Sequence, residues 1–337
     1  MSDIANPFLV YGYVSPKYFC DRQEDTQKLI SALQNGRNVT LMSPRRMGKT
    51  GLIKNVFYEV ARQKPEVACF YLDIYSTTCL NDFIILLGQT VIGKLDSFSQ
   101  RTLASLTGFF KSCHLVFSSD PLSGVPQVTL DFQPTQAQAT LKEIFDYLGM
   151  SGKECYIAID EFQQISGYVE KNVEATLRTY VQHCNNARFI FAGSQRHVMG
   201  NMFLTPSRPF YQSVSMMHLE SIPLEEYIRF AGTHFKRAGK EIEENAIIVI
   251  YQQFEGITWY IQKVLNTLYD MTSEQGVCRV EMVPGAIRQI IDSFRYTYSE
   301  ILFRLPEKQK ELLIAITKEG KAKAVTSGAF IRKYRLA

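Results

Sequence analysis

The sequence predicts an α/β protein built on a parallel sheet, followed by an all-helical region. Two patterns predict this fold class. From residue 24 to residue 219, short apolar runs of strand length alternate with segments of helical periodicity. After Pro223 only helical patterns follow. A composition of 46% hydrophobic and 21% charged residues over 337 positions fits a globular protein of two or three domains and excludes a disordered chain.

The first region carries the expected core strands, which are apolar runs bounded by turn residues or carboxylates. They cover residues 38–42, 67–74, 154–160, 188–192 and 214–219. Helices are expected between them, over residues 24–36, 50–62, 80–95, 135–149 and 173–184. Two further strands at 113–118 and 127–132, around a turn with Asp120, Pro121 and Gly124, predict a hairpin insertion at about 112–133.

The strand pattern ends near residue 220, which indicates a domain boundary there. Helical patterns then cover residues 224–237, 244–254, 259–272 and 283–303. Pro306 suits the first turn of a further helix that reaches about Thr317, and a short helix is expected over 328–335. We therefore expect an α/β domain over 1–220, a helical domain over 221–304 and a third unit over 305–337.

Charge and cysteine content exclude several classes of protein. The net charge of +4 is too small to indicate nucleic-acid binding by itself. The seven cysteines include no CxxC pair, which argues against a disulfide framework or a zinc site and favours free thiols, most of them buried. No apolar run approaches the roughly 20 residues of a membrane-spanning helix, and Met1–Pro7 lacks the features of a secretory signal. We expect a cytoplasmic protein without a membrane partner.

The strongest motif is Met42-Ser-Pro-Arg-Arg-Met-Gly-Lys-Thr50, between an expected strand and an expected helix, and it predicts a phosphate-binding loop. Backbone N–H groups of such a loop and of the next helix point at one place and bind an anion there. Gly48 lets the backbone approach the phosphate, Lys49 adds a positive charge, and the Thr50 hydroxyl can bind Mg²⁺. An ordinary basic turn is the alternative. The expected phosphate contacts are Ser43, Pro44, Arg45, Arg46, Met47, Gly48, Lys49, Thr50 and Gly51.

An acidic pair follows the apolar strand at 154–160. The strand delivers Asp160 and Glu161 to the carboxyl edge of the sheet, where ligands bind in parallel α/β folds. Asp160 is expected to hold Mg²⁺, and Glu161 to act as the base that activates water. The alternative is a strand that ends in a solvated turn. A second carboxylate favours hydrolysis over transfer to a small molecule, so a kinase is the weaker interpretation.

The next strand ends at Gly193 and leads into another strand-to-helix turn. Ser194 and Gln195 are candidates to sense a γ-phosphate, and Arg196 is a candidate to stabilise charge in the transition state. The alternative role for Ser194 is a simple helix N-cap.

Together, these motifs resemble the archaeal/bacterial ATPase family within the STAND group of AAA+-like NTPases, over roughly residues 6–330. The loop Ser-Pro-Arg-Arg-x-Gly-Lys-Thr is typical of that family, including the serine at Ser43 in place of glycine. The resemblance implies a sheet order of 5-1-4-3-2, a helical lid, and an element around Arg22 beside the adenine. It also implies a Gly-x-Pro contact in the lid, which here is Gly256-Ile257-Thr258, followed by Trp259 and Tyr260. We expect these two aromatic residues in the core, with a place in the base pocket as the alternative.

The resemblance further implies a winged helix after the lid. Residues 303–337 look like its first two helices, which predicts that the sequence is truncated before the recognition helix and the wing. Basic residues are frequent over 318–335, and Glu319 is the only acid there, which leaves a solvated surface or a DNA-backbone contact as alternatives. The basic residues are Lys318, Lys321, Lys323, Arg332, Lys333 and Arg335.

The sequence therefore predicts an ATP-binding, Mg²⁺-dependent P-loop ATPase that acts as a nucleotide-regulated switch. The resemblance implies ATP rather than GTP, and the absence of a guanine-reading Asn/Thr-Lys-x-Asp element after the fourth core strand agrees with this. The alternative is a DNA-binding or oligomerising regulator with slow or vestigial hydrolysis. Expected ligands and partners are ATP or ADP with Mg²⁺, DNA through the basic segment, and a second copy or another protein.

Overall fold

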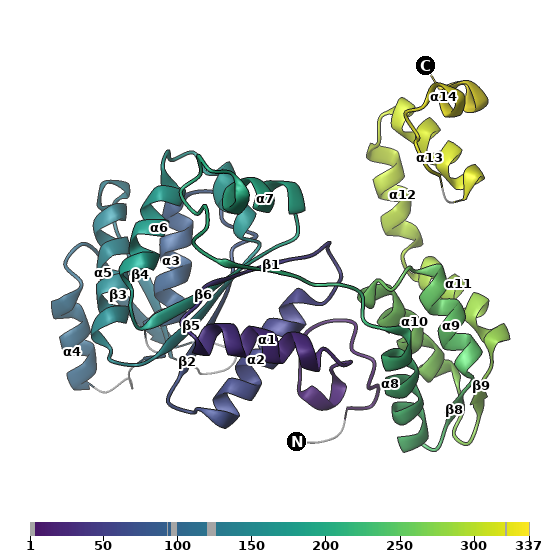
Figure 1. Ribbon diagram of the computed structural model, residues 1–337, viewed down its shortest axis with the longest axis horizontal. Helices are drawn as coiled ribbons and strands as arrows, with labels where there is room; N and C mark the ends of the chain where they lie inside the picture. The colour runs from purple at the N-terminus through teal and green to yellow at the C-terminus, as the bar shows by residue number, and fades with distance from the viewer. Residues whose placement is uncertain (1–3, 93, 96–99, 120–125, 321, 337) are drawn as a thin grey trace.

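The computed structural model describes residues 4–92, 94–95, 100–119, 126–320 and 322–336. A five-stranded parallel sheet forms the centre of the first part of the chain (Figure 1). Its order is β2-β5-β6-β1-β7. Counted along the chain without the hairpin strands, this is the predicted order 5-1-4-3-2, which is confirmed. The strands are β1 (Val39–Met42), β2 (Ala68–Asp73), β5 (Cys155–Asp160), β6 (Ala187–Gly193) and β7 (Ser215–His218).

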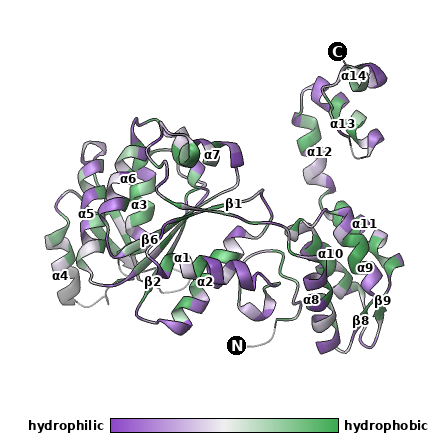
Figure 2. Ribbon diagram, in the orientation of Figure 1, coloured by the Kyte–Doolittle hydropathy of each residue, from purple (hydrophilic) through white to green (hydrophobic). Residues whose placement is uncertain are grey.

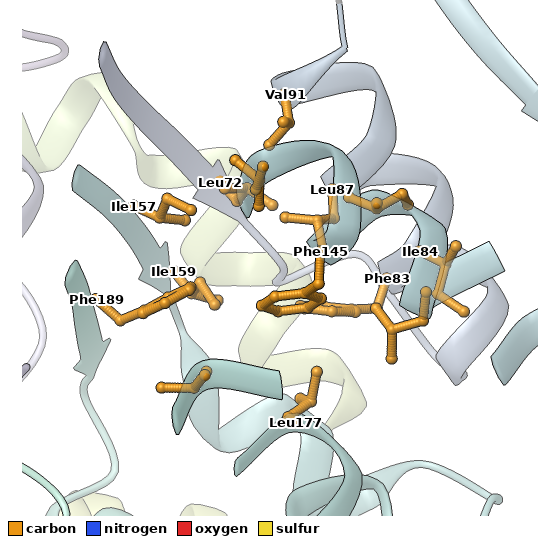
Figure 3. Close-up of a cluster of buried hydrophobic side chains, with 14 of the residues drawn as sticks. Leu72, Phe83, Ile84, Leu87, Val91, Phe145, Ile157, Ile159, Leu177 and Phe189 are labelled. Atoms are coloured by element: carbon orange, nitrogen blue, oxygen red, sulfur yellow. The ribbon is translucent and has the colours of Figure 1, made fainter. Parts of the chain in front are cut away.

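Helices cover both faces of this sheet because successive strand residues point to opposite sides. Ile157 and Ile159 of β5 pack on one side, against Phe145 and the other apolar side chains shown in Figure 3. Tyr156 and Ala158 of the same strand pack on the other side. The first side carries α3 (Leu80–Val91), α5 (Ala137–Met150), α6 (Val173–His183) and α7 (Arg196–Leu204), and the second carries α1 (Gln23–Gln34) and α2 (Lys49–Gln63).

A two-stranded antiparallel ribbon, β3 (His114–Ser119) with β4 (Pro126–Asp131), lies against α3. Its contact with α3 needs glycine, because a Cβ at Gly88 would lie 2.5 Å from Leu130 Cδ1. The expected turn with Asp120, Pro121 and Gly124 lies outside the described residues. The helix α4 (Gln100–Phe109) precedes the ribbon and was not predicted.

The helical region after the sheet has a hydrophobic core of its own, visible as green inner faces in Figure 2. It consists of α8 (Leu224–Arg237), α9 (Glu244–Gln253), α10 (Thr258–Met271) and α11 (Val283–Ser293), with two short parallel strands, β8 (Glu241–Ile242) and β9 (Val277–Cys278). We call these helices the lid.

The N-terminal segment belongs to the lid core, far from it in sequence. Phe8 is fully buried there, with its ring against Phe230, Phe235 and Tyr269. The backbone is fixed as well, since Asn266 Nδ2 donates to the Phe8 carbonyl at 2.8 Å. The chain then crosses to the sheet domain and enters α1, so that this segment links the two parts a second time.

The expectation of a single helix over residues 283–303 is wrong. It is divided at Phe294, whose φ of −104° and ψ of 6° end α11 and precede α12 (Arg295–Arg304). α12 leads away from the lid to α13 (Glu307–Glu319) and α14 (Gly328–Tyr334), which lie apart from the sheet domain (Figure 1). No helix among the described residues is long and apolar enough to cross a membrane. All seven cysteines are free, and five of them are buried.

Candidate functional site

The predicted phosphate loop connects β1 to α2 at the carboxyl edge of the sheet. Gly48 precedes the first helical residue, Lys49, at a φ of 90°, where a side chain would be strained. Ser43 is buried and its N–H donates to the carbonyl of Gly193 at 3.4 Å, which ties the loop to the end of β6. Met47 is buried beneath the loop, whereas Pro44, Arg45 and Arg46 are exposed. The loop therefore leaves the first N–H groups of α2 facing the cavity described below.

Lys49 is almost fully buried, with 6% of its surface exposed. Burial lowers the pKa of its ammonium group, an effect that the nearby Arg45 adds to and that Asp160 and Glu161 oppose. The buried ammonium group has lost most of the water that would solvate its charge. Anionic phosphate oxygens can take the place of that water, so the site is suited to a polyanion.

Asp160 is held in place by three hydrogen bonds. Its Oδ2 accepts from the Thr50 hydroxyl at 2.7 Å and from the Tyr71 hydroxyl at 2.9 Å, and its Oδ1 accepts from the backbone N–H of Glu161 at 3.0 Å. The structure thus brings together Thr50 and Asp160, the two residues predicted to hold Mg²⁺. Tyr71 was missed. Its strand was expected, but no local pattern marks one tyrosine of a strand as a partner of a carboxylate 89 positions later.

Glu161 follows Asp160 in a left-handed conformation, with φ 56° and ψ 38°. Its Oε2 accepts from the Ser194 hydroxyl at 2.9 Å and from the amide of Gln163. Ser194, predicted as a γ-phosphate sensor, is therefore in direct contact with the predicted base. Ser194 is not the N-cap of α7, since Gln195 occupies that position and no side-chain cap bond is formed. Gln163 is buried and was not predicted.

Arg196 lies apart from this group. It is exposed in the first turn of α7 and is not among the residues that line the cavity next to Lys49.

A cavity of about 510 Å³ opens beside the phosphate loop. The loop and the carboxylates Asp73 and Glu161 form one part of its wall, and the lid and the N-terminal segment form the rest. Asp73 is exposed, but partial burial and the charges of Asp160 and Glu161 raise its pKa. The wall beyond the loop is largely apolar and aromatic, and includes Leu9, Val10, Tyr11, Tyr13, Tyr18, Phe19, Ile222 and Trp259.

Arg22 lines the same cavity, but its guanidinium is used to join segments of the protein. Nη2 donates to the carbonyls of Met47 and Glu220 at 2.9 Å each, and Nη1 pairs with Asp25 at 3.0 Å. Arg22 thus connects the phosphate loop to the linker that enters the lid. The resemblance placed it beside the adenine, and the structure places it between these two segments and the cavity.

The lid contacts the phosphate loop through the start of α10. The N–H of Trp259 donates to the Arg46 carbonyl at 3.0 Å, and the Arg46 guanidinium lies 4.5 Å from the centroid of the Trp259 ring. The guanidinium also donates to the Tyr260 hydroxyl. The expectation that Trp259 and Tyr260 lie in the core is wrong, because both are half-buried, and Trp259 lines the cavity.

The residues present fit a magnesium nucleotide. Mg²⁺ prefers oxygen donors and usually binds one or two protein ligands together with phosphate oxygens and water. Thr50 and Asp160 supply such oxygens, and the described part of the chain contains no group of three or more His, Cys, Asp or Glu side chains that would hold an ion alone. Lys49 and the glycine at the start of α2 complete a cradle for phosphates.

Comparisons with known proteins agree with this architecture. A family model described as "Probable winged helix domain" matches residues 296–337. Comparison with curated proteins gives no match. Among solved structures, the Walker-type ATPase of Pyrococcus abyssi aligns with a TM-score of 0.61 at 18% identity, over 92% of this chain and 83% of that chain. The Aeropyrum pernix ORC1 protein in complex with DNA aligns with a TM-score of 0.58 at 13% identity, over 98% and 81%.

The Aeropyrum pernix ORC2 protein, in ADPNP and ADP complexes, also has a TM-score of 0.58, at 16% identity over 97% of this chain and 82% of that chain. At these identities the likeness concerns the fold. The resemblance to the STAND group in particular stays a prediction. The fold itself, a parallel α/β sheet of the P-loop NTPase type with a C-terminal winged-helix region, is confirmed.

Proposed function

We propose that this protein is a Mg²⁺-dependent ATPase in which the bound nucleotide sets the position of the lid. One observation carries the proposal: Lys49, Thr50 and Glu161 line one cavity, with Asp160 bonded to Thr50, and the lid and the N-terminal segment form much of the remaining wall. A nucleotide in that cavity contacts both parts of the protein, so its presence changes the free energy of their association.

In this proposal the loop N–H groups and Lys49 bind the β- and γ-phosphates. Thr50 and Asp160 hold Mg²⁺, which supplies positive charge to the phosphate oxygens. Glu161 accepts the proton of the attacking water, and Ser194 orients the Glu161 carboxylate through their hydrogen bond. Arg196 as a charge stabiliser stays a prediction, since its side chain is exposed outside the cavity wall.

Phosphate release and nucleotide binding test this assignment together. We expect Glu161→Gln to bind ATP as the parent does and to lose hydrolysis by about 100-fold or more, since a positioned general base contributes that much. We expect Lys49→Ala to lose affinity for ATP. Unchanged turnover in Glu161→Gln contradicts the base assignment, and unchanged affinity in Lys49→Ala contradicts the phosphate loop. Glu220→Gln is a matched control, because its side chain is not part of the cavity wall.

A second function is favoured by the C-terminal region. Residues 296–337 match a winged-helix model, and in the basic segment 318–335 the side chains of Lys318, Lys323, Arg332 and Arg335 are exposed. A fifth, Lys333, is paired with Glu319 at 2.7 Å. We propose that this region contacts a DNA backbone, as a nucleotide-regulated output of the ATPase. Binding of duplex DNA that weakens with salt and disappears in a quadruple Ala variant of the four exposed residues supports this. No binding at low salt contradicts it.

Oligomerisation is the remaining alternative from the sequence. Light scattering with and without ATP distinguishes a monomer from an assembly that forms on nucleotide binding. An assembly that forms only in the presence of ATP supports a second copy of the chain as the partner. A mass that ATP leaves unchanged contradicts this alternative.

A further inference from the structure

One face of α10 carries three polar side chains at successive turns, Thr258, Gln262 and Asn266. The first and the last of them are engaged. The Thr258 hydroxyl donates to the carbonyl of Met47 in the phosphate loop at 3.4 Å. Asn266 Nδ2 donates to the carbonyl of Phe8 in the N-terminal segment at 2.8 Å. This row of side chains therefore runs from the phosphate loop to the N-terminal segment, along the cavity between them.

Gln262, in the middle of the row, has an unused acceptor. Only 7% of its surface is exposed, it lines the cavity, and its Oε1 is buried with no hydrogen-bond partner among the described residues. A buried amide oxygen without a partner costs free energy, because it has lost water and gained nothing in return. A donor on a ligand in the cavity removes that cost.

The position of Gln262 indicates which part of a nucleotide it meets. It lies one helical turn, about 6 Å along the axis, beyond the residue that contacts the phosphate loop. Beyond the loop the cavity wall is largely aromatic and aliphatic, and it includes Phe19, Ile222 and Trp259. Flat apolar surfaces bind the faces of a purine, and a primary amide at their edge binds the polar rim of the ring.

We propose that Gln262 reads the base, with its Oε1 accepting a hydrogen bond from the 6-amino group of adenine. The inference rests on the proposed function, since it requires a nucleoside triphosphate in this cavity. Guanine and hypoxanthine carry a carbonyl oxygen at the same position, which repels Oε1 in this orientation, so that binding them requires the buried amide to turn over and present Nε2. Gln262 is thus a specificity-determining residue, and the lid selects ATP over GTP through it.

Binding measurements without hydrolysis test this. Isothermal titration of ATP, of purine riboside triphosphate, which lacks the 6-amino group, and of ITP is compared in the parent protein, Gln262→Leu and Gln262→Glu. We expect the parent to bind ATP about tenfold more tightly than purine riboside triphosphate, as one buried hydrogen bond allows. In Gln262→Leu we expect equal affinities for these two nucleotides. Gln262→Glu keeps an acceptor oxygen and is expected to keep the preference for ATP. Gln253→Leu, at an exposed position of α9, is the control.

The possible failures are distinct. If the parent binds no nucleotide, the proposed function itself is wrong. If Gln262→Leu keeps the full preference for ATP over purine riboside triphosphate, the inference is wrong while the proposed function stands. If that variant instead loses a preference for ATP over 2′-deoxy-ATP, Gln262 contacts the ribose and base reading is overturned. CTP carries an equivalent 4-amino donor, and affinity for CTP equal to that for ATP overturns the selection of a purine.

Discussion

Tyr71 of β2 donates its hydroxyl to the same carboxylate oxygen of Asp160 that accepts from Thr50, at 2.9 Å and 2.7 Å. Burial raises the pKa of Tyr71, an effect that the charge of Asp160 increases, so that the hydroxyl stays protonated and remains a donor. Tyr71 thus fixes the rotamer of the carboxylate proposed to hold Mg²⁺, although it does not itself line the cavity.

The first prediction concerns this positioning role. In Tyr71→Phe we expect the Mg²⁺ concentration for half-maximal hydrolysis to rise about three- to tenfold, as the loss of one hydrogen bond to a charged group allows. Affinity for ATP without Mg²⁺ is expected to stay the same. Tyr180→Phe is the matched control, because the Tyr180 ring stacks on Phe145 away from the cavity. An unchanged Mg²⁺ dependence in Tyr71→Phe contradicts the role.

The second prediction concerns the contact between loop and lid. Removing the Arg46 guanidinium from the Trp259 ring loses a cation–π contact worth about 0.5–1 kcal/mol at an exposed site. We expect ATP to dissociate from Arg46→Ala about two- to fivefold faster, which corresponds to the free energy of the lost contact. We also expect faster hydrogen exchange in the first turn of α10. Arg45→Ala is the control, because Arg45 lies over Tyr75 of the sheet domain at 5.9 Å. If hydrogen exchange in α10 is equally fast in Arg46→Ala and Arg45→Ala, the Arg46–Trp259 contact does not hold the lid to the phosphate loop.

The third prediction concerns pH and the anchoring of the N-terminal segment. His234 is buried in the lid, stacked on Tyr18, with its Nε2 3.1 Å from the Lys17 carbonyl. Burial lowers the pKa of His234. The hydrogen bond to the Lys17 carbonyl opposes this effect, whereas the charges of Arg237 and Lys17 add to it. Between this lowered pKa and the ordinary value of about 6.5, the unfolded chain binds more protons than the folded one.

Stability is therefore fully present above about pH 6.5 and falls as the pH is lowered through that window. We expect urea midpoints of the parent to decrease from pH 7 to pH 5 more steeply than those of His234→Phe, which keeps a stacking ring but cannot take up a proton. Parallel pH curves for the two proteins refute the assignment to His234.

The fourth prediction uses the close packing behind Glu161. A Cβ at Gly193 would lie 2.6 Å from both Gln163 Oε1 and Met199 Sδ, two side chains that are themselves buried. We expect Gly193→Ala to lose about 1–3 kcal/mol of unfolding free energy, as overpacked cores do. Turnover should fall more than ATP affinity, since Gln163 bonds to Glu161. Gly149→Ala, with open space around it in α5, is expected to be at least as stable as the parent.

The sheet order was implied by the resemblance to a known family, whereas most of the candidate site could be predicted from local signals in the sequence. The phosphate loop is one contiguous motif, and strands that end in Asp160 or in Gly193 deliver the next residues to the same sheet edge. These contacts follow once parallel pairing is assumed.

Contacts between distant segments could not be read in this way. The bond between Arg46 and Trp259 spans 213 positions (259 minus 46), and the cavity wall combines Leu9 with Gln262. Neither involves a spacing that periodicity can detect. The helix break at Phe294 was also missed, since the apolar pattern continues through it and the backbone alone changes. Trp259 was expected in the core, but its backbone N–H bonds to Arg46 in the phosphate loop and its side chain lies on the cavity wall.

The position of Trp259 has a practical consequence. It is the only tryptophan in the sequence, and it lies on the wall of the cavity with Arg46 over its ring. All indole emission of the protein thus originates at the junction between loop and lid. Its wavelength depends on how much water reaches the ring, so in the proposed function opening of the lid would shift the emission to the red. The unlabelled protein therefore carries its own optical test of the proposed lid movement, in real time.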